Sequence, residues 1–245
     1  MAGADRIFVA LDVPSRAQAL DLVETLAPLG CGFKVGLELL SAVGPGVVEQ
    51  LAERGLRVFV DAKLHDIPNT VGGAARALAA RGAWMITVHV AGGRDMVRAA
   101  LDGAREGARR GVSPPRVVGV TVLTSLSAAM LSQAAGVERA AEAEVARRAM
   151  AGQDWGLDGL VCSPREARGL RRLLGPGPLL VTPGIRPAGS PTGDQQRVAG
   201  AAEAIRWGAD YLVVGRPVRE SAEPAAALAA LAAEVAAVSG GGGYP

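Results

Sequence analysis

Charged residues follow an apolar run in the stretch Val60–Thr70, which reads VDAKLHDIPNT. Two carboxylates, Asp61 and Asp66, lie close together in this stretch with Lys63 between them. A charged group removed from water without a partner costs several kcal/mol, so each group must be paired, solvated or used in chemistry. Carboxylates and ammonium groups held at the end of a strand could stabilise a developing charge or transfer a proton. A solvated loop is the simpler alternative.

Side-chain alternation turns other polar residues toward the same place. Alternate residues of a strand face the same side, and the large apolar residues of these strands are expected to face helices. The opposite side then carries Asp12, Lys34, Asp61, Lys63 and His89, each near the carboxyl end of its strand. Barrel enzymes build their active sites at that end, so we expect charges of alternating sign at one barrel mouth. An ion-pair network that only closes the barrel is the alternative, although it would be weakly stabilising.

Glycines and arginines after the last two predicted strands indicate an anion site. The motifs TPGIR, GDQQ and VVGRP contribute Gly184, Arg186, Gln195, Gly215 and Arg216. In barrels the loops at this position commonly bind phosphate. Glycine lets backbone N–H groups approach an anion, and a guanidinium matches the geometry of phosphate. A lone Gly-Arg pair could be solvated surface, but the combination favours a phosphate site.

The elements that would position these residues are eight short, β-branched runs that predict strands. They begin at Ile7, Cys31, Arg57, Met85, Arg116, Gly159, Leu179 and Tyr211. Between them, apolar residues at three- and four-residue spacing predict helices. This alternation favours a single α/β domain over residues 1–245, a (β/α)8 barrel. The loop RPAGSPTGDQQ is a candidate lid, and the glycine-rich tail from about residue 240 is expected to be disordered.

The composition is that of an ordinary globular protein. Of 245 residues, 49% are hydrophobic and 20% are charged, and a net charge of +2 argues against a nucleic acid polymer as partner. We expect a cytoplasmic protein with no membrane partner, because no signal peptide and no apolar stretch of about 18 residues is visible. Cys31 and Cys162 stand alone and are expected in the core, and His65 and His89 lack a metal-binding spacing, so no metal site is expected.

The motifs and their order resemble those of a known family. ALDV, FKVGLELL, DAKLHDIPNT, VTVLTSL, TPGIRPAG…GDQQRV and GADYLVVGRP are similar to successive motifs of orotidine 5′-phosphate decarboxylases, over almost the whole chain. The resemblance implies a catalytic set made of Lys34, Asp61, Lys63 and Asp66. It also implies a substrate-binding set made of Asp12, Lys34, Thr70, Thr124, Arg186, Gln195, Gly215 and Arg216.

The same resemblance implies an assembly and a pair of ligands. Asp66 and the loop after it would reach into the site of a second subunit, and Thr70 would contact the ligand there, in a homodimer with shared active sites. The ligands would be orotidine 5′-phosphate and uridine 5′-monophosphate (UMP). Asp12 and Lys34 would hold the ribose hydroxyls, and Thr124 would hold the pyrimidine ring.

The implied reaction uses no cofactor. Loss of carbon dioxide from C6 of the ring leaves a carbanion without an imine, thiamine or metal to accept the electrons, so fixed positive charge must stabilise it. Lys63 would do so and then donate its proton to C6. Asp61, near the substrate carboxylate, would disfavour the ground state more than the transition state.

Two other functions fit parts of the pattern. A magnesium-dependent sugar-phosphate decarboxylase or aldolase of the same barrel group would share the DxKxxD motif, but it would need an acidic metal ligand where this chain has Lys34. A non-catalytic protein that binds nucleotide phosphates would not need Asp61 or Lys63. The chain departs from the family at Gly200-Ala201, where Thr-Pro is usual, and we expect only a small local loss of stability there.

Overall fold

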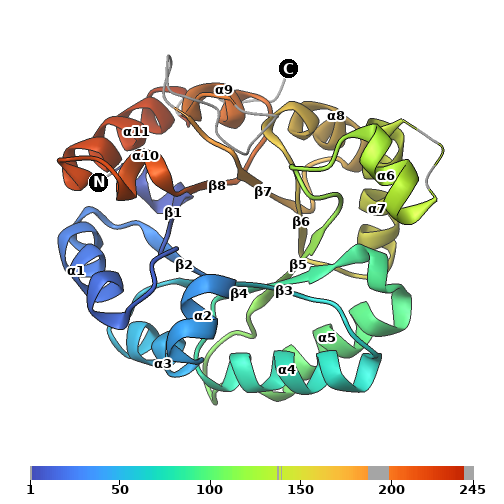
Figure 1. Ribbon diagram of the computed structural model, residues 1–245, viewed down its shortest axis with the longest axis horizontal. Helices are drawn as coiled ribbons and strands as arrows, with labels where there is room; N and C mark the ends of the chain where they lie inside the picture. The colour runs from blue at the N-terminus through green and yellow to red at the C-terminus, as the bar shows by residue number, and fades with distance from the viewer. Residues whose placement is uncertain (1, 137, 139, 187–198, 240–245) are drawn as a thin grey trace.

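Eight parallel strands form a closed barrel in the computed structural model, which describes residues 2–136, 138, 140–186 and 199–239 (Figure 1). The strands follow one another in chain order, and β8 pairs with β1 to close the sheet. Their bounds are β1 Ile7–Ala10, β2 Gly32–Gly36, β3 Val58–Leu64, β4 Met85–His89, β5 Arg116–Val120, β6 Gly159–Val161, β7 Leu179–Pro183 and β8 Tyr211–Val214. The predicted (β/α)8 barrel is confirmed, and every strand lies within a predicted run.

Helices surround the barrel and connect its strands (Figure 1). Their bounds are α1 Arg16–Leu26, α2 Leu37–Val43, α3 Gly46–Glu53, α4 Pro68–Ala80, α5 Arg94–Glu106, α6 Ala128–Ala135, α7 Ala141–Asp154, α8 Pro164–Leu174, α9 Ala201–Arg206, α10 Arg216–Arg219 and α11 Pro224–Ser239. Short 3₁₀ turns lie at Ala4–Arg6, Ala27–Leu29 and Val90–Gly92. Helix α9 begins directly after Gly200, and its amino terminus has no hydrogen bond from a capping side chain.

Strand residues alternate between the barrel interior and the surrounding helices, as predicted. On β1, Ile7 and Val9 are fully buried in the cluster that packs against helices, whereas Phe8 belongs to the interior cluster. The buried members of that interior cluster are Phe8, Ala10, Phe59, Met85, Val118, Val181 and Val213. The Phe8 ring lies 5.6 Å from the rings of Phe59 and Tyr211 and 5.5 Å from that of Trp84. Aromatic side chains therefore fill the amino-terminal end of the barrel and leave space at the carboxyl end.

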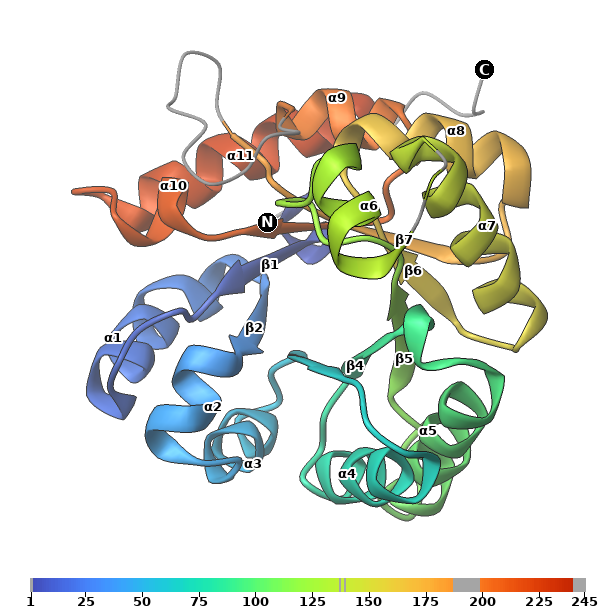
Figure 2. The ribbon, with the colours of Figure 1, turned by 45° about the vertical axis from the view of Figure 1, so that its right-hand side comes forward.

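The helices α4 and α5 pack against each other through glycines (Figure 2). A Cβ atom at Gly103 would lie 2.1 Å from the carbonyl oxygen of Gly72, and one at Gly107 would lie 2.2 Å from that of Arg76. Any larger residue at these two positions would push the helices apart. Because α4 begins at Pro68, just after the charged stretch of β3, this packing fixes the end of the loop that carries Asp66.

Some sequence-based predictions concern parts of the chain that are not described. The candidate lid after Arg186 and the glycine-rich tail from about residue 240 lie outside the described residues. Cys31 and Cys162 are buried, as predicted, and burial raises the pKa of the Cys31 thiol to about 12. Within the described segments, no helix has both the length and the apolar character needed to cross a membrane.

Candidate active site

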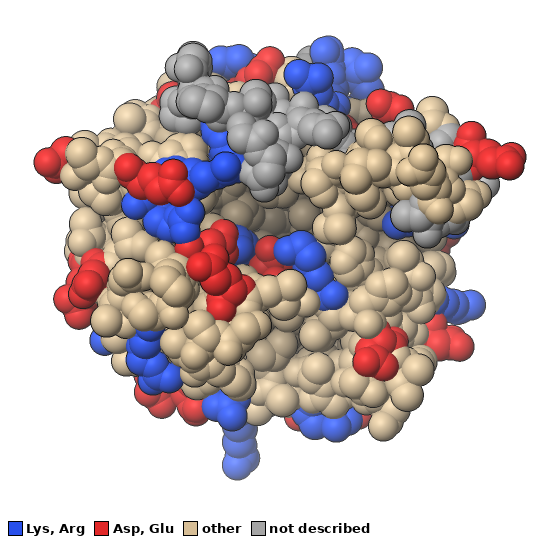
Figure 3. All heavy atoms as spheres, viewed as in Figure 1, with Lys and Arg blue, Asp and Glu red and all other residues tan. Residues whose placement is uncertain are grey.

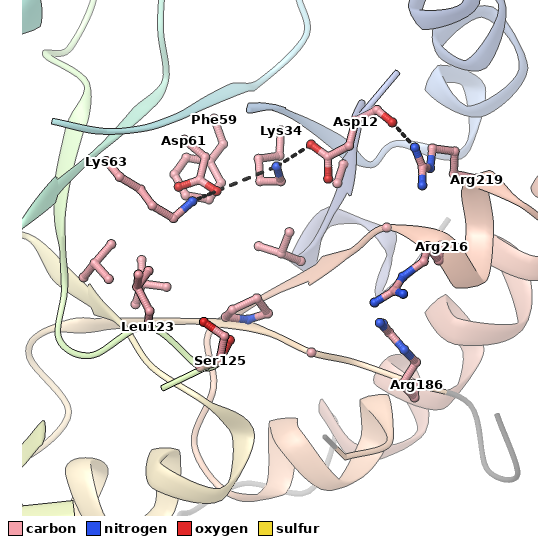
Figure 4. Close-up of a pocket in the computed structure, with 18 of the residues that line it drawn as sticks. Asp12, Lys34, Phe59, Asp61, Lys63, Leu123, Ser125, Arg186, Arg216 and Arg219 are labelled. Carbon is pink, nitrogen blue, oxygen red and sulfur yellow. Dashed lines mark hydrogen bonds and ion pairs between the residues drawn. The ribbon is translucent and has the colours of Figure 1, made fainter. Parts of the chain in front are cut away.

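A row of alternating charges crosses the carboxyl ends of the first three strands (Figure 4). Lys34 Nζ lies 2.9 Å from Asp12 Oδ1 and 3.7 Å from Asp61 Oδ2, and Lys63 Nζ lies 2.8 Å from the same Asp61 oxygen. The side chains of Lys34 and Asp61 are only 9% and 14% exposed. Gly36 makes room for the first pair, since a Cβ atom there would lie 2.7 Å from Lys34 Nζ.

The electrostatics of the row keep Asp61 ionised. Burial raises the pKa of the Asp61 carboxyl group, but the positive charges of Lys34 and Lys63 and hydrogen bonds from Lys63 and Thr87 outweigh it, so the pKa is lowered overall. Lys34 and Lys63 are the only lysines in the sequence, since every other basic residue except the two histidines is an arginine. A lysine ammonium can give up a proton, whereas a guanidinium in a protein does not.

A cavity of about 440 Å³ opens beside this row, at the hollow in the centre of the face seen in Figure 3. Apolar residues of the barrel interior, such as Ala10, Phe59 and Val213, line its floor. Thr124 and Ser125, on the segment after β5, also line the cavity, and Ser125 lies across it from the charged row (Figure 4). The cavity therefore combines an apolar floor with polar walls, as a site for a small polar molecule does.

Arginines line the end of the cavity next to the carboxyl ends of β7 and β8 (Figure 4). Arg186 follows β7 and Arg216 follows β8, and their guanidinium groups point toward each other. Gly184 has a φ of 83°, a backbone conformation that favours glycine, so a larger residue would be strained at this turn. Two guanidinium groups beside glycine backbone suit a ligand with two negative charges, such as a phosphate ester.

Comparisons with known proteins agree with this geometry. The family model described as "Orotidine 5'-phosphate decarboxylase / HUMPS family" matches residues 5–231. The chain belongs to the orotidine 5′-phosphate decarboxylase family. It is 52% identical over 236 residues to the orotidine 5′-phosphate decarboxylase of Moorella thermoacetica, covering 96% of this chain and 94% of that protein. It is also 52% identical over 233 residues to that of an Anaeromyxobacter species, covering 95% and 99%.

The fold gives the same family assignment. A crystal structure of orotidine 5′-phosphate decarboxylase from Lactobacillus acidophilus superimposes with a TM-score of 0.85 at 36% identity, covering 94% of this chain and 98% of that one. The chain is therefore an enzyme of the decarboxylase family, with the barrel of its relatives.

The structure brings together most of the residues that sequence reasoning selected for this decarboxylase-family site. Those that line the cavity are Asp12, Lys34, Asp61, Lys63, Thr124, Gly184, Arg186, Gly215 and Arg216. Asp66 and Thr70 are exposed and do not line it, and Asp66 Oδ1 instead accepts a hydrogen bond from the backbone of Ile67 at 2.6 Å. Gln195 lies outside the described residues.

His89, expected at the mouth with these charges, is not among the residues that line the cavity, although the charges of Lys63 and Asp61 act on it. Strand β4 ends at His89, the chain then turns through Val90–Gly92, and the imidazole lies 5.3 Å from the ring of His65. Burial, followed by the positive charges of His65 and Lys63, lowers the pKa of His89 to about 4. Among the described residues, no cluster of three or more histidine, cysteine or carboxylate side chains could hold a metal ion.

Sequence reasoning missed Thr87, Ser125 and Arg219. Thr87 has the strand parity of Met85, which faces the barrel interior, so alternation could have identified it. Arg219 lines the cavity and donates a hydrogen bond to the backbone oxygen of Asp12. Nothing in the local sequence predicts that contact, because the two residues lie at opposite ends of the chain and meet only when the barrel closes.

Proposed function

We propose that this chain decarboxylates orotidine 5′-phosphate to UMP and carbon dioxide, a step of pyrimidine nucleotide synthesis. The observation that carries the proposal is the row Asp12, Lys34, Asp61 and Lys63, which faces one cavity together with a pair of arginines. The named activity of relatives about half identical over nearly the whole chain supports it. The reaction suits the cytoplasmic location expected from the sequence.

The substrate fits the cavity in one orientation. The 5′-phosphate binds at Arg186 and Arg216, because their guanidinium groups line the cavity and point toward each other (Figure 4). The ribose hydroxyls reach Asp12 and Lys34, which form an ion pair at 2.9 Å. The pyrimidine ring then lies over the apolar floor near Thr124, with C6 toward Lys63.

Lys63 carries the chemical step in this proposal. The bond from C6 to the carboxylate breaks, carbon dioxide leaves as a neutral molecule, and the electron pair stays on C6. The Lys63 ammonium stabilises this carbanion through its fixed charge, then transfers a proton to C6 to give UMP, and solvent returns a proton to the amine. Asp61 keeps Lys63 oriented through their 2.8 Å contact.

Asp61 also acts on the substrate before the bond breaks. Its carboxylate stays ionised because its pKa is lowered, so it repels the carboxylate of the bound substrate. That repulsion disappears as carbon dioxide leaves, which favours the transition state over the ground state. Binding of the distant phosphate offsets the cost of holding the two carboxylates together.

The proposed reaction needs no metal ion or organic cofactor. Lys34 occupies the end of β2, where the metal-dependent relatives of this barrel group would need an acidic ligand, and its ammonium repels a divalent cation. The magnesium-dependent sugar-phosphate reaction is therefore not favoured. A purely binding role is not favoured either, because binding alone does not require Asp61 between two ammonium groups.

The proposed enzyme is a homodimer in which Asp66 and Thr70 complete the site of the second subunit. Both side chains are exposed in the single chain and lie outside its own cavity. Ile67, between them, is 66% exposed, and Leu37, at the start of α2, is 56% exposed. Large exposed apolar side chains next to polar side chains that lie outside the chain's own cavity are typical of a surface that another chain covers.

Two experiments test the proposal. The purified chain is incubated with orotidine 5′-phosphate in D₂O, and the product is analysed by absorbance and proton NMR. We expect UMP with deuterium at C6, whereas an absence of UMP contradicts the proposed activity and hydrogen at C6 contradicts protonation by an exchangeable ammonium.

The second experiment mixes inactive variants under conditions of subunit exchange. Asp66→Asn mixed with Lys63→Ala should regenerate activity, because one site of each heterodimer holds both intact residues. Asp102→Asn, which changes an exposed carboxylate of α5, is the control and should be fully active alone. If subunits demonstrably exchange and no activity returns, the shared site is wrong.

A further inference from the structure

The junction between β3 and β4 is irregular where the charged residues lie. Val60 pairs with Ile86 and Leu64 pairs with Val88, so β3 advances four residues while β4 advances two. The extra residues of β3 fall between Val60 and Leu64, the segment that carries Asp61 and Lys63. Backbone N–H and C=O groups in such a bulge lose their regular hydrogen-bond partners on the neighbouring strand and need other partners.

Lys63 has an unusual backbone conformation in this bulge. Its φ is 48°, and it is the one non-glycine residue with a positive φ in the part of the chain that the structure describes. A residue with a Cβ atom pays about 1 to 3 kcal/mol for such a conformation, which persists only where its surroundings hold it. The residue proposed to donate the proton therefore depends on its neighbours for its position.

The hydroxyl of Thr87 is the neighbour that holds both residues. Thr87, on β4, is fully buried. Its Oγ1 accepts a hydrogen bond from the Lys63 backbone N–H at 2.8 Å and donates one to Asp61 Oδ1 at 3.0 Å. The other carboxylate oxygen, Asp61 Oδ2, is left to face Lys63 and Lys34. One hydroxyl thus replaces a missing ladder acceptor and also fixes which carboxylate oxygen faces the lysines.

We infer that Thr87 is a positioning residue for the decarboxylation, an inference that rests on the proposed function. Thr87 does not line the cavity, so it acts through Asp61 and Lys63 and not on the substrate. The role needs a group that donates and accepts a hydrogen bond at once, which a hydroxyl provides and an alkyl side chain of the same shape does not. Serine therefore preserves the function of Thr87, and valine does not.

Thr87→Val and Thr87→Ser test the inference, with Thr182→Val as the matched control. Thr182 is also fully buried, but it lies on β7 next to Val181, which faces the interior, so its side chain points away from the cavity. We expect kcat of Thr87→Val to fall about tenfold to a hundredfold, as for the loss of a hydrogen bond to a charged group, while its affinity for UMP changes less than threefold. Thr87→Ser and Thr182→Val should keep kcat within threefold of the parent.

A second measurement is independent of activity. Hydrogen exchange of the Lys63 amide should be faster in Thr87→Val than in Thr87→Ser, because the amide loses the hydroxyl acceptor that lies 2.8 Å away. If the parent fails to decarboxylate the substrate, the proposed function fails, and the exchange rates still decide whether Thr87 holds Lys63.

Two results would overturn the inference. One is a Thr87→Val protein with parental kcat and parental exchange at Lys63. The other is a Thr87→Ser protein as impaired as Thr87→Val, since the hydroxyl would then be irrelevant. Should Thr87→Val not fold, Thr87→Cys replaces it, because a thiol is only a weak donor and acceptor. We then expect the kcat of Thr87→Cys to fall below that of Thr87→Ser, and equal values contradict the inference.

Discussion

Lys63→Ala separates chemistry from binding in the proposed mechanism. The substitution removes the ammonium group 2.8 Å from Asp61 Oδ2 and leaves Lys34 at 3.7 Å from the same oxygen. At an effective dielectric constant of about 20, these separations correspond to attractions of roughly 6 and 4 kcal/mol before desolvation. The pKa of Asp61 therefore rises, but the carboxylate keeps a cationic partner. Because the Lys63 side chain is 30% exposed, its loss leaves little buried space, and we expect the variant to fold.

The expected loss of turnover is large because one side chain has two roles. A preorganised electrostatic donor is worth about 10²- to 10³-fold and a general acid about 10²- to 10⁴-fold, so kcat should fall by at least about 10³-fold. Absorbance measures the decarboxylation, and calorimetry measures UMP binding, which should change less than about tenfold. Lys63→Arg is the matched variant, since it keeps the charge and does not release a proton, and its turnover should lie between those of the parent and Lys63→Ala.

One outcome would refute this reasoning. If Lys63→Ala kept turnover within tenfold of the parent while its affinity for UMP collapsed, Lys63 would be a binding residue. The mechanism would then need another proton donor.

Three other predictions follow from the geometry. Arg216→Ala should weaken binding of UMP at least tenfold, as for the loss of a charge-assisted contact, and should also lower kcat. The affinity for uridine, which lacks the phosphate, should not change, and equal losses of affinity for both ligands contradict a phosphate site. In His65→Gln, which leaves one histidine, NMR should show His89 titrating below 6.5, because burial, the largest cause of its lowered pKa, remains; a midpoint near 6.5 contradicts that burial. Glu144→Gln should reduce the free energy of unfolding by about 1 to 3 kcal/mol at pH 7, because Glu144 is 1% exposed and bonds Arg147 and Arg148. Hydrogen bonds from Arg147 and the charges of both arginines outweigh burial and lower the pKa of Glu144 to about 2. The difference in unfolding free energy between the parent and Glu144→Gln should therefore shrink as pH falls from about 4.5 to 2. Urea unfolding that shows a constant difference over this range contradicts the prediction.

The alternation of side chains along the strands was enough to predict the charged part of the site. A side chain's parity depends only on its place in the strand, so the sequence alone assigns Asp12, Lys34, Asp61 and Lys63 to one mouth of the barrel. The same rule turns His89 inward, but parity does not say how close a side chain lies to the cavity. Strand β4 ends at His89, and this residue is not among those that line the cavity.

Contacts set by closure of the barrel could not be predicted in this way. The bulge between β3 and β4, and with it the two hydrogen bonds of Thr87, depends on how two strands pair in three dimensions. The bond from Arg219 to the backbone of Asp12 joins the end of α10 to the segment after β1. Parity could place Thr87 on the inner side, but only the register reveals what its hydroxyl binds.

The central claim is that the charges of this chain carry out the decarboxylation without a metal ion or other cofactor. The most direct test measures the rate of conversion of orotidine 5′-phosphate to UMP by the metal-stripped protein in excess chelator. We predict an undiminished rate, because Lys34 holds the position that a metal would need and Lys63 supplies the stabilising charge and the proton. Strong inhibition by the chelator that magnesium reverses would contradict the claim.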